Sequence, residues 1–437
     1  MSVLATVANG AFDGALGPHY DPVSVSRDLA LSLGLAGHYA GEEGLDETSR
    51  TIRFLDQGSD GQSGYGAVTD STGVFLIRHT SQEFTELMRS VGVNKWAEGF
   101  RPSLPNLVAG ILREEGIDIY SYETNPNLDD ETKALIRASM LSALRAEYVR
   151  GEPRLPLTWQ DANDYHNAAH NLQVASTAYY LADITSHQSN HTFEHIKKDG
   201  SVFSLKHKLN CLVCALSHDV DHPGFGNPAN DRTYNERRSV DVMAPIWRAA
   251  GLSDELIMLN RSIIAATSPN GMIAGLKKAL TMVSQENPED VDFSALAKEY
   301  PELTPLFQGG LETAQLHLEM AAIVNDADLT VSAACGLEAN AFQSKLLTKE
   351  AKAAGIDMNF ESHGARMYFL ENIVGTKGFG SRAGIEYFNP SFYALLSATA
   401  SRMTLDEGHE RFRMGLDAEL VRRKSLGLEN RGLHLTG

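Results

Sequence analysis

From Leu104 onward, apolar residues recur every three or four positions, and the alternation typical of strands is almost absent. This spacing places the apolar side chains on one face of a helix. We predict helices over residues 104–116, 129–151, 162–184, 204–219, 237–251, 253–267, 310–329 and 390–405. The main body is therefore predicted to be all-α, with the Pro- and Gly-rich stretches as its connections.

The N-terminal residues differ in composition from this body. Residues 1–75 are rich in Gly and in turn-prone stretches, followed by a predicted short strand at 72–79 and a short helix at 81–92. We therefore expect three parts. They are a short mixed or irregular N-terminal region of unknown role (1–90), a helical domain (91–410) and a charged helical tail (411–437).

The charge of the chain excludes some classes of partner. With 38 Lys and Arg against 56 Asp and Glu, the formal charge is -18. Phosphate backbones and anionic lipids repel such a surface, so we expect no nucleic-acid partner. The longest apolar runs are too short for a membrane span, and the first residues lack the basic start of a secretory signal. Three Cys fit a reducing compartment, so we expect a cytoplasmic protein.

The densest group of chemically active side chains is the stretch HDVDHPG at 218–224. It follows a predicted helix that is apolar on most of its surface and should be buried. Four ionisable side chains in five residues at a buried helix end are costly unless they are paired or bind a metal ion. Imidazoles and carboxylates are typical ligands of Zn²⁺ and similar ions. A solvated, polar helix end is the alternative interpretation.

Two other pieces could contribute to the same site. His166 and His170 are four residues apart, so on a helix they would share a face, one as a metal ligand and the other beside the substrate. The stretch NDADL at 325–329 closes an apolar helix and offers a further carboxylate ligand. Taken singly, each piece has a plain alternative interpretation: a surface His pair for the first, and a capped or solvated helix end for the second.

The pieces occur together and in order: YHNAAH (165–170), HDVDHPGFGN (218–227), DADL (326–329) and, less closely, SRAGIEYFNPSF (381–392). In this the chain resembles the class I cyclic-nucleotide phosphodiesterases, a branch of the HD family of metal-dependent phosphohydrolases. The resemblance implies a compact multi-helix catalytic domain. It also implies hydrolysis of a 3′,5′-cyclic nucleotide, cyclic AMP or cyclic GMP or both, to the 5′-monophosphate.

The resemblance also implies roles for single residues. The ligands of a first metal, Zn²⁺, would be His170, His218, Asp219 and Asp328. Asp219 would bridge to a second metal, Mg²⁺ or Mn²⁺, and Asp221 and His222 would orient the waters around it. A hydroxide between the metals would be the nucleophile, and His166 would be the general acid that protonates the O3′ leaving group.

The residues that would bind the nucleotide depart from the family pattern. Asn227 matches, but Arg382 stands where the family has the Gln that binds the purine, and Ile385 stands where it has a clamping Phe. Tyr387 and Phe388 are nearby aromatic candidates for that clamp. Arg only donates hydrogen bonds, so it cannot pair with the adenine amino group, whereas guanine O6 and N7 accept from it.

A second departure concerns a carboxylate. The family's SVLEN segment is matched only in part, by SVDV at 239–242. Glu236 or Asp241 would take the place of its Glu.

Two alternatives remain open for the function. One is an HD-type phosphohydrolase that acts on another nucleotide, which the two changes at 382 and 385 favour. The other is a catalytically weak relative that binds a nucleotide for regulation, although all four predicted ligand positions are filled. The expected partner is the cyclic nucleotide substrate, and the sequence leaves homodimerisation open.

Overall fold

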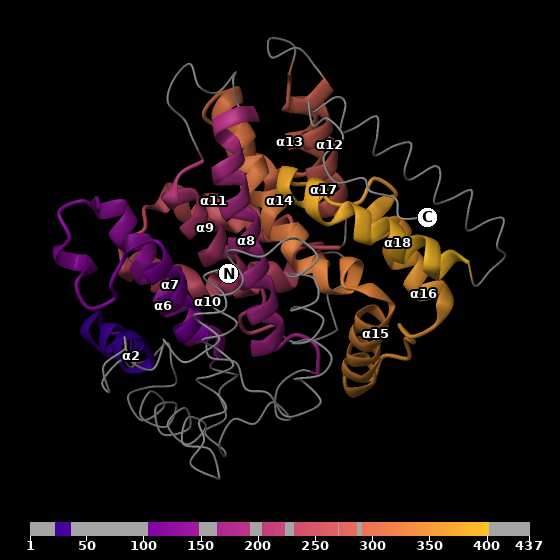
Figure 1. Cartoon of the computed structure of the whole chain (residues 1–437), viewed down its shortest axis with the longest axis horizontal. Coiled ribbons are helices and arrows are strands. Elements are labelled where there is room, and N and C mark those ends of the chain that lie inside the picture. The colour runs from indigo at the N-terminus through magenta and orange to yellow at the C-terminus, as the bar shows by residue number, and fades with distance from the viewer. Residues whose placement is uncertain are drawn as a thin grey trace, which may run out of the picture.

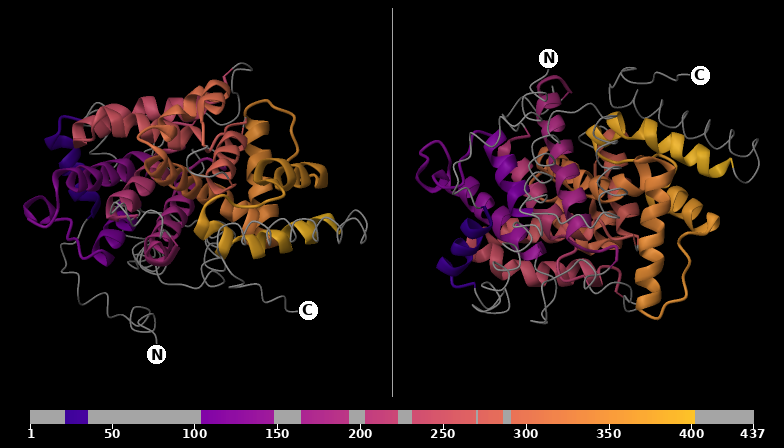
Figure 2. Two further views of the ribbon diagram at one scale, coloured as in Figure 1. Left: turned by 90° about the horizontal axis from the view of Figure 1, so that it is seen from above. Right: turned by 60° about the horizontal axis from the view of Figure 1, so that its bottom comes forward.

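The computed structural model describes residues 22–35, 104–147, 164–192, 203–222, 231–269, 271–285 and 291–401. Within these ranges every regular element is a helix, which confirms the predicted all-α class (Figures 1 and 2). None of the helices in these ranges is long and apolar enough to cross a membrane.

The helices of the first half of the chain are α2 (Pro22–Ser32), α6 (Leu104–Glu114), η3 (Tyr122–Thr124), α7 (Asp130–Glu147), α8 (Ala168–Thr192), α9 (Leu205–Ser217) and α10 (Tyr234–Ala250). The second half contains α11 (Asp254–Ala265), α12 (Met272–Gln285), α13 (Ser294–Glu299), η6 (Pro301–Phe307), α14 (Leu311–Ala334), α15 (Gly336–Ala353), α16 (His363–Tyr368), the π-helix η7 (Phe369–Gly375), α17 (Arg382–Tyr387) and α18 (Asn389–Ala400).

Helix α14 lies at the centre of the fold and packs against α8, α9, α11, α12, α15, α17 and α18. Its residues from Ala314 to Ala334 are almost all buried, as expected of a helix with neighbours all round. Figures 1 and 2 show α2, α6 and α7 on one flank of the molecule and α15, α16 and α18 on the opposite flank. A residue on α14 can therefore contact segments from both halves of the chain.

Helix α9 is the second central element and is buried from Lys208 to Ser217 between α7, α8 and α14. Its one buried charge, Lys208, is neutralised by Glu115 and by Asp183, whose Oδ1 lies 3.0 Å from the Lys208 Nζ. Because the helix is buried along its length, the residues that follow it emerge inside the protein, as the sequence predicted.

Several predicted helix boundaries were wrong. Helix α8 spans Ala168–Thr192 rather than 162–184, and helix α18 ends at Ala400 rather than at 405. Helix α8 begins at Ala168 because Asn167 Oδ1 accepts a hydrogen bond from His170 N at 3.3 Å and caps the first turn. His166 therefore precedes the helix and does not share a helical face with His170. Helix α14 does not close at 325–329 but continues to Ala334, because Asp326 finds hydrogen-bond donors outside the helix.

The sequence did not predict α12, α13, α15, α16 or α17, which lie in stretches taken as connections. Helix α2 packs against α6 and α7, and its Ala30, together with Leu35, joins the same hydrophobic core as the rest of the fold. The predicted strand at 72–79, the helix at 81–92 and the tail at 411–437 lie outside the described residues. The domain limits 1–90, 91–410 and 411–437 stay predictions.

The central position of α9 predicts a large effect of a cavity in it. Leu212 is fully buried, so Leu212→Ala should lower the free energy of unfolding by about 2–5 kcal/mol. Leu337, which is 37% exposed on α15, provides the control, and Leu337→Ala should cost about 1 kcal/mol or less. Equal losses for the two variants in urea denaturation would contradict the packing described.

Candidate metal centre

Two carboxylates, from Asp219 and Asp328, lie beside the Nε2 atoms of His170 and His218, and the ligand atoms of His170, His218 and Asp219 all lie within 4.8 Å of one another. His170 Nε2 lies 3.2 Å from Asp219 Oδ2 and 3.1 Å from Asp328 Oδ1. His218 Nε2 lies 3.1 Å from the same Asp219 oxygen, 3.7 Å from the same Asp328 oxygen and 3.4 Å from His170 Nε2. The structure thus brings together the four residues that the resemblance implies as ligands of the first metal.

Each of these residues is placed by its own element. His170 stands in the first turn of α8, His218 caps the C-terminus of the buried helix α9, and Asp219 follows it. Asp328 projects from the middle of α14. Because α8, α9 and α14 pack against one another, residues 158 positions apart in the sequence meet within one small volume.

The orientation of His218 fits a metal ligand. Its Nδ1 lies 2.7 Å from the carbonyl oxygen of Ala215, which only accepts, so Nδ1 carries a proton and donates it. In the neutral ring, Nε2 then presents its lone pair to the cluster. A backbone carbonyl that fixes the tautomer of a His in this way is usual at metal sites.

The electrostatics of the cluster also fit a cation. The imidazoles of His218 and His170 outweigh the effect of burial and hold the pKa of Asp219 and of Asp328 below the ordinary range. Burial disfavours charge on His218, but the neighbouring carboxylate of Asp219 raises its pKa well above the usual value. Two carboxylates and two imidazoles form a donor set that suits Zn²⁺ or a similar divalent ion.

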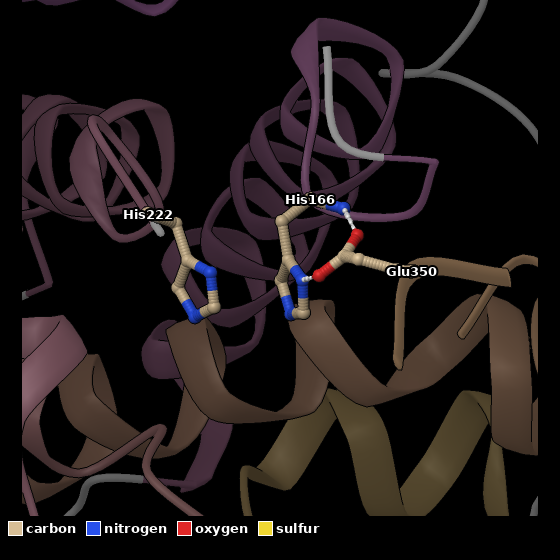
Figure 3. Close-up of side chains that lie close together, drawn as sticks. All are labelled: His166, His222 and Glu350. Carbon is tan, nitrogen blue, oxygen red and sulfur yellow. Dashed lines mark hydrogen bonds and ion pairs between the residues drawn. The ribbon is translucent and has the colours of Figure 1, made fainter. Parts of the chain in front are cut away.

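A second group of side chains lies next to this cluster: His166, His222 and Glu350 (Figure 3). His166 Nδ1 lies 2.5 Å from Glu350 Oε1, and the other Glu350 oxygen accepts from the backbone N–H groups of Tyr165 at 2.9 Å and His166 at 3.0 Å. The rings of His166 and His222 are stacked, with centroids 3.9 Å apart. His222 Nε2 in turn lies 2.9 Å from Asn235 Nδ2, which can only donate to it.

This group is arranged in a way that suits proton transfer. Figure 3 shows Glu350 and His222 on opposite sides of the His166 ring. One ligand atom of each residue lies within 4.8 Å of the others, so the group could also hold a metal ion. Burial disfavours charge on His166, but the carboxylates of Glu350 and Asp219 outweigh it and raise the pKa of His166 to about 9. Burial and the charge on His166 lower the pKa of His222 to about 3.

Three further predicted residues can be compared with the structure. Asp221 lies in the turn that follows α9 and has a positive φ of 60°. It accepts hydrogen bonds from Arg238 Nε and Nη2 at 3.1 and 3.0 Å, and these bonds attach the turn to helix α10. Asp241 is exposed and pairs with Arg261 at 2.6 Å. Glu236 is buried, one of its oxygens has no hydrogen-bond partner among the described residues, and burial raises its pKa to about 7. Of the two candidates for the place of the family's Glu, Glu236 is therefore the one that lies inside the fold.

The predicted nucleotide-binding residues are partly described. Asn227 lies outside the described residues. Arg382 begins α17 and is half-buried, and burial lowers its pKa. Ile385 is 1% exposed. The Tyr387 ring packs edge-on against Tyr180 of α8, with centroids 6.5 Å apart.

The last of these residues, Phe388, is fully enclosed in the core, where it packs against Phe379 with ring centroids 5.7 Å apart.

Sequence reasoning missed Glu350 and Asn235. Glu350 lies in the mixed-charge stretch KLLTKEAKA of α15, where nothing distinguishes it from solvent-exposed acids. Asn235 precedes Glu236 on α10, outside any stretch singled out above. Glu350 contacts His166, 184 positions away, and Asn235 contacts His222 across the connection between α9 and α10, so neither contact follows from a local pattern.

The converging ligand atoms lead to a binding prediction. Asp328→Asn keeps the shape of the side chain but removes an anionic ligand, so the affinity for Mn²⁺ or Zn²⁺ should fall by about 10–100-fold or more. His187→Ala removes an imidazole whose side chain is 76% exposed and should leave affinity unchanged. Isothermal titration of the two variants and the wild type measures both. Undiminished affinity in Asp328→Asn would contradict the ligand set.

A comparison with known families matches the part of the chain that carries most of these residues. Residues 165–236 match the family model for 3'5'-cyclic nucleotide phosphodiesterase. The matched span contains His166, His170, His218 and Asp219, whereas Asp328 lies beyond it. No curated protein matches the chain. Residues 165–236, about one sixth of the chain, are thus similar to part of the catalytic domain of the 3'5'-cyclic nucleotide phosphodiesterases.

Proposed function

We propose that this protein hydrolyses a 3′,5′-cyclic nucleotide to the 5′-monophosphate at the centre formed by α8, α9 and α14. One observation carries the proposal: four metal-ligating atoms converge beside a histidine that is bound to a buried carboxylate. The first group can hold a divalent ion and the second can donate a proton. Hydrolysis of a phosphodiester with a poor leaving group needs both.

In this proposal His170, His218, Asp219 and Asp328 hold the first metal, and Asp219 also faces a second. When bound, such ions acidify a water and polarise the phosphoryl oxygens. We assign Zn²⁺ to the first position because imidazole nitrogen and carboxylate oxygen are its usual ligands. Mg²⁺ or Mn²⁺ at the second position suits a site that is built mostly from water and carboxylate.

His166 is the proposed general acid. Its Nδ1 lies 2.5 Å from Glu350 Oε1, and we assign the proton of the other ring nitrogen, Nε2, to the O3′ leaving group of the nucleotide. Glu350 also accepts from two backbone N–H groups, which fixes its carboxylate in place. His222, stacked on the ring face and held by Asn235, limits rotation of His166.

Glu236 is the proposed holder of a metal-bound water. It is buried near the charges of Asp219 and Asp328, and one of its oxygens lacks a partner among the described residues. A water held there would satisfy that oxygen. Asp221, in contrast, is committed to Arg238, so we propose that it shapes the turn that carries His222.

The direct test is an assay of the purified protein with Mn²⁺ or Mg²⁺ against cyclic AMP, cyclic GMP and bis(4-nitrophenyl) phosphate. We expect turnover of at least one cyclic nucleotide and none after chelation. Cleavage of the aryl diester with no cyclic nucleotide turned over would reject the proposal. Arg382 and Ile385 would then favour an HD-type phosphohydrolase that acts on another nucleotide.

The proton donor can be tested separately from the metals. His166→Ala should cut turnover of a cyclic nucleotide by about 10²–10⁴-fold, because O3′ must leave as an alkoxide without a proton. Metal content should stay near that of the wild type. Bis(4-nitrophenyl) phosphate should lose far less activity, since an aryl oxide leaves without protonation. Glu350→Gln should reproduce the pattern more weakly, and loss of metal in His166→Ala would reverse the assignment.

The base preference depends on the residue at 382. Because Arg donates only, adenine would leave its amino group unpaired, at a cost of about 1–3 kcal/mol. The wild type should therefore not prefer cyclic AMP strongly, and Arg382→Gln should shift the ratio of kcat/KM values toward cyclic AMP by roughly one to two decades. Tyr387→Ala should weaken both substrates if its ring clamps the base. If the wild type is selective for cyclic AMP and Arg382→Gln does not change the ratio of kcat/KM values, residues other than Arg382 recognise the base.

A further inference from the structure

Asp326 is a buried carboxylate that the proposed reaction does not use. It is fully enclosed on α14, two residues before Asp328. Its Oδ1 accepts from Gly380 N at 2.8 Å, and its Oδ2 accepts from Ser381 N at 2.6 Å and Ser381 Oγ at 2.7 Å. Hydrogen bonds to a carboxylate are stronger than neutral ones, so the segment that begins at Gly380 is tightly bound to α14.

A second carboxylate of the same helix extends this attachment. Glu319, 5% exposed, accepts from Arg382 N at 2.8 Å through its Oε1. The backbone N–H groups of residues 380, 381 and 382 are thus all bound by acids of α14. Ser381 Oγ also accepts from Gly384 N at 3.0 Å and caps α17.

The fit between the two segments allows little movement. A Cβ added at Gly384 would overlap Asp326 Oδ2 and lie 2.8 Å from Ser381 Oγ. Gly384 therefore permits the close approach of α17 to the carboxylate. On the C-terminal side, Asn389 Oδ1 accepts from Phe379 N at 2.8 Å and closes the segment on itself.

We propose that Asp326 is a positioning residue that holds the segment 381–388 at a fixed place relative to the metal centre and thereby sets the affinity for the nucleotide base. The inference rests on the proposed function, in which this segment contacts the base. Side chains two residues apart on a helix point about 200° apart, so Asp328 serves the metals while Asp326 faces α17. One rigid helix then fixes where both the phosphate and the base bind.

The test compares substrates with and without a base. Asp326→Asn turns one acceptor oxygen into an NH₂ group that faces N–H donors, so α17 should lose its place. We expect KM for the preferred cyclic nucleotide to rise about ten- to a hundredfold, with a smaller change in kcat. Manganese-dependent cleavage of bis(4-nitrophenyl) phosphate should stay within about twofold, because this diester carries no base. Equal loss on both substrates, or no change on either, would overturn the proposal.

Two variants control for general loss of structure. Ser381→Ala removes one of the hydrogen bonds and leaves those to the backbone N–H groups, so it should raise KM in the same direction but less; this keeps the proposal testable if Asp326→Asn does not fold. Asp183→Asn changes another buried carboxylate, paired with Lys208, and should leave both KM and the aryl-diester rate near wild type. A KM rise of the same size in Asp183→Asn would assign the effect to stability and overturn the proposal.

Failure of the proposed function would give a different result. If the wild type cleaves the aryl diester but turns over no cyclic nucleotide, that function is rejected, and the proposed role of Asp326 in base affinity is rejected too. A wild type that is active on cyclic nucleotides, with Asp326→Asn unchanged, rejects the role of Asp326 alone.

Discussion

Two carboxylates and two imidazoles face one another where α8, α9 and α14 meet, and the rest of the site depends on this contact. The side chains of Asp219 and Asp328 are only 10% and 20% exposed, so their negative charges need a partner of opposite charge. The imidazoles of His170 and His218 can provide it when protonated. A divalent ion between the four side chains would balance the charge and accept the lone pairs of both neutral rings.

Helix α14 connects this centre to the remainder of the fold. Its inner position lets Asp328 reach the ligand cluster from one side while Asp326 and Glu319 bind the start of α17 on another. The partner helix α15, which follows α14 directly, supplies Glu350 to His166. The proposed metal ligand Asp328, the proposed acid and the proposed base-binding segment are thus all positioned by α14 or by the helix that follows it.

The sequence was sufficient to predict the helical class, and the family resemblance named the four side chains that the structure brings together, whose role as metal ligands stays a prediction. The stretch HDVDHPG indicates a metal or polar site by itself, because so many ionisable groups at the end of an apolar helix need a ligand or a partner. The stretch NDADL was misjudged as a helix end, since the donors that satisfy Asp326 come from residues 380 and 381, more than 50 positions away. Glu350 was missed for the same reason. Side-chain contacts between helices far apart in the sequence depend on how the helices pack, so local sequence patterns do not predict them.

The central claim is that one ion binds between these four side chains. It is tested most directly by anomalous diffraction from crystals of the protein grown with Mn²⁺ or Zn²⁺. The account predicts an anomalous peak about 2.0–2.5 Å from His170 Nε2, His218 Nε2, Asp219 Oδ2 and Asp328 Oδ1. A peak only between His166, His222 and Glu350, or no peak in this region, would contradict it.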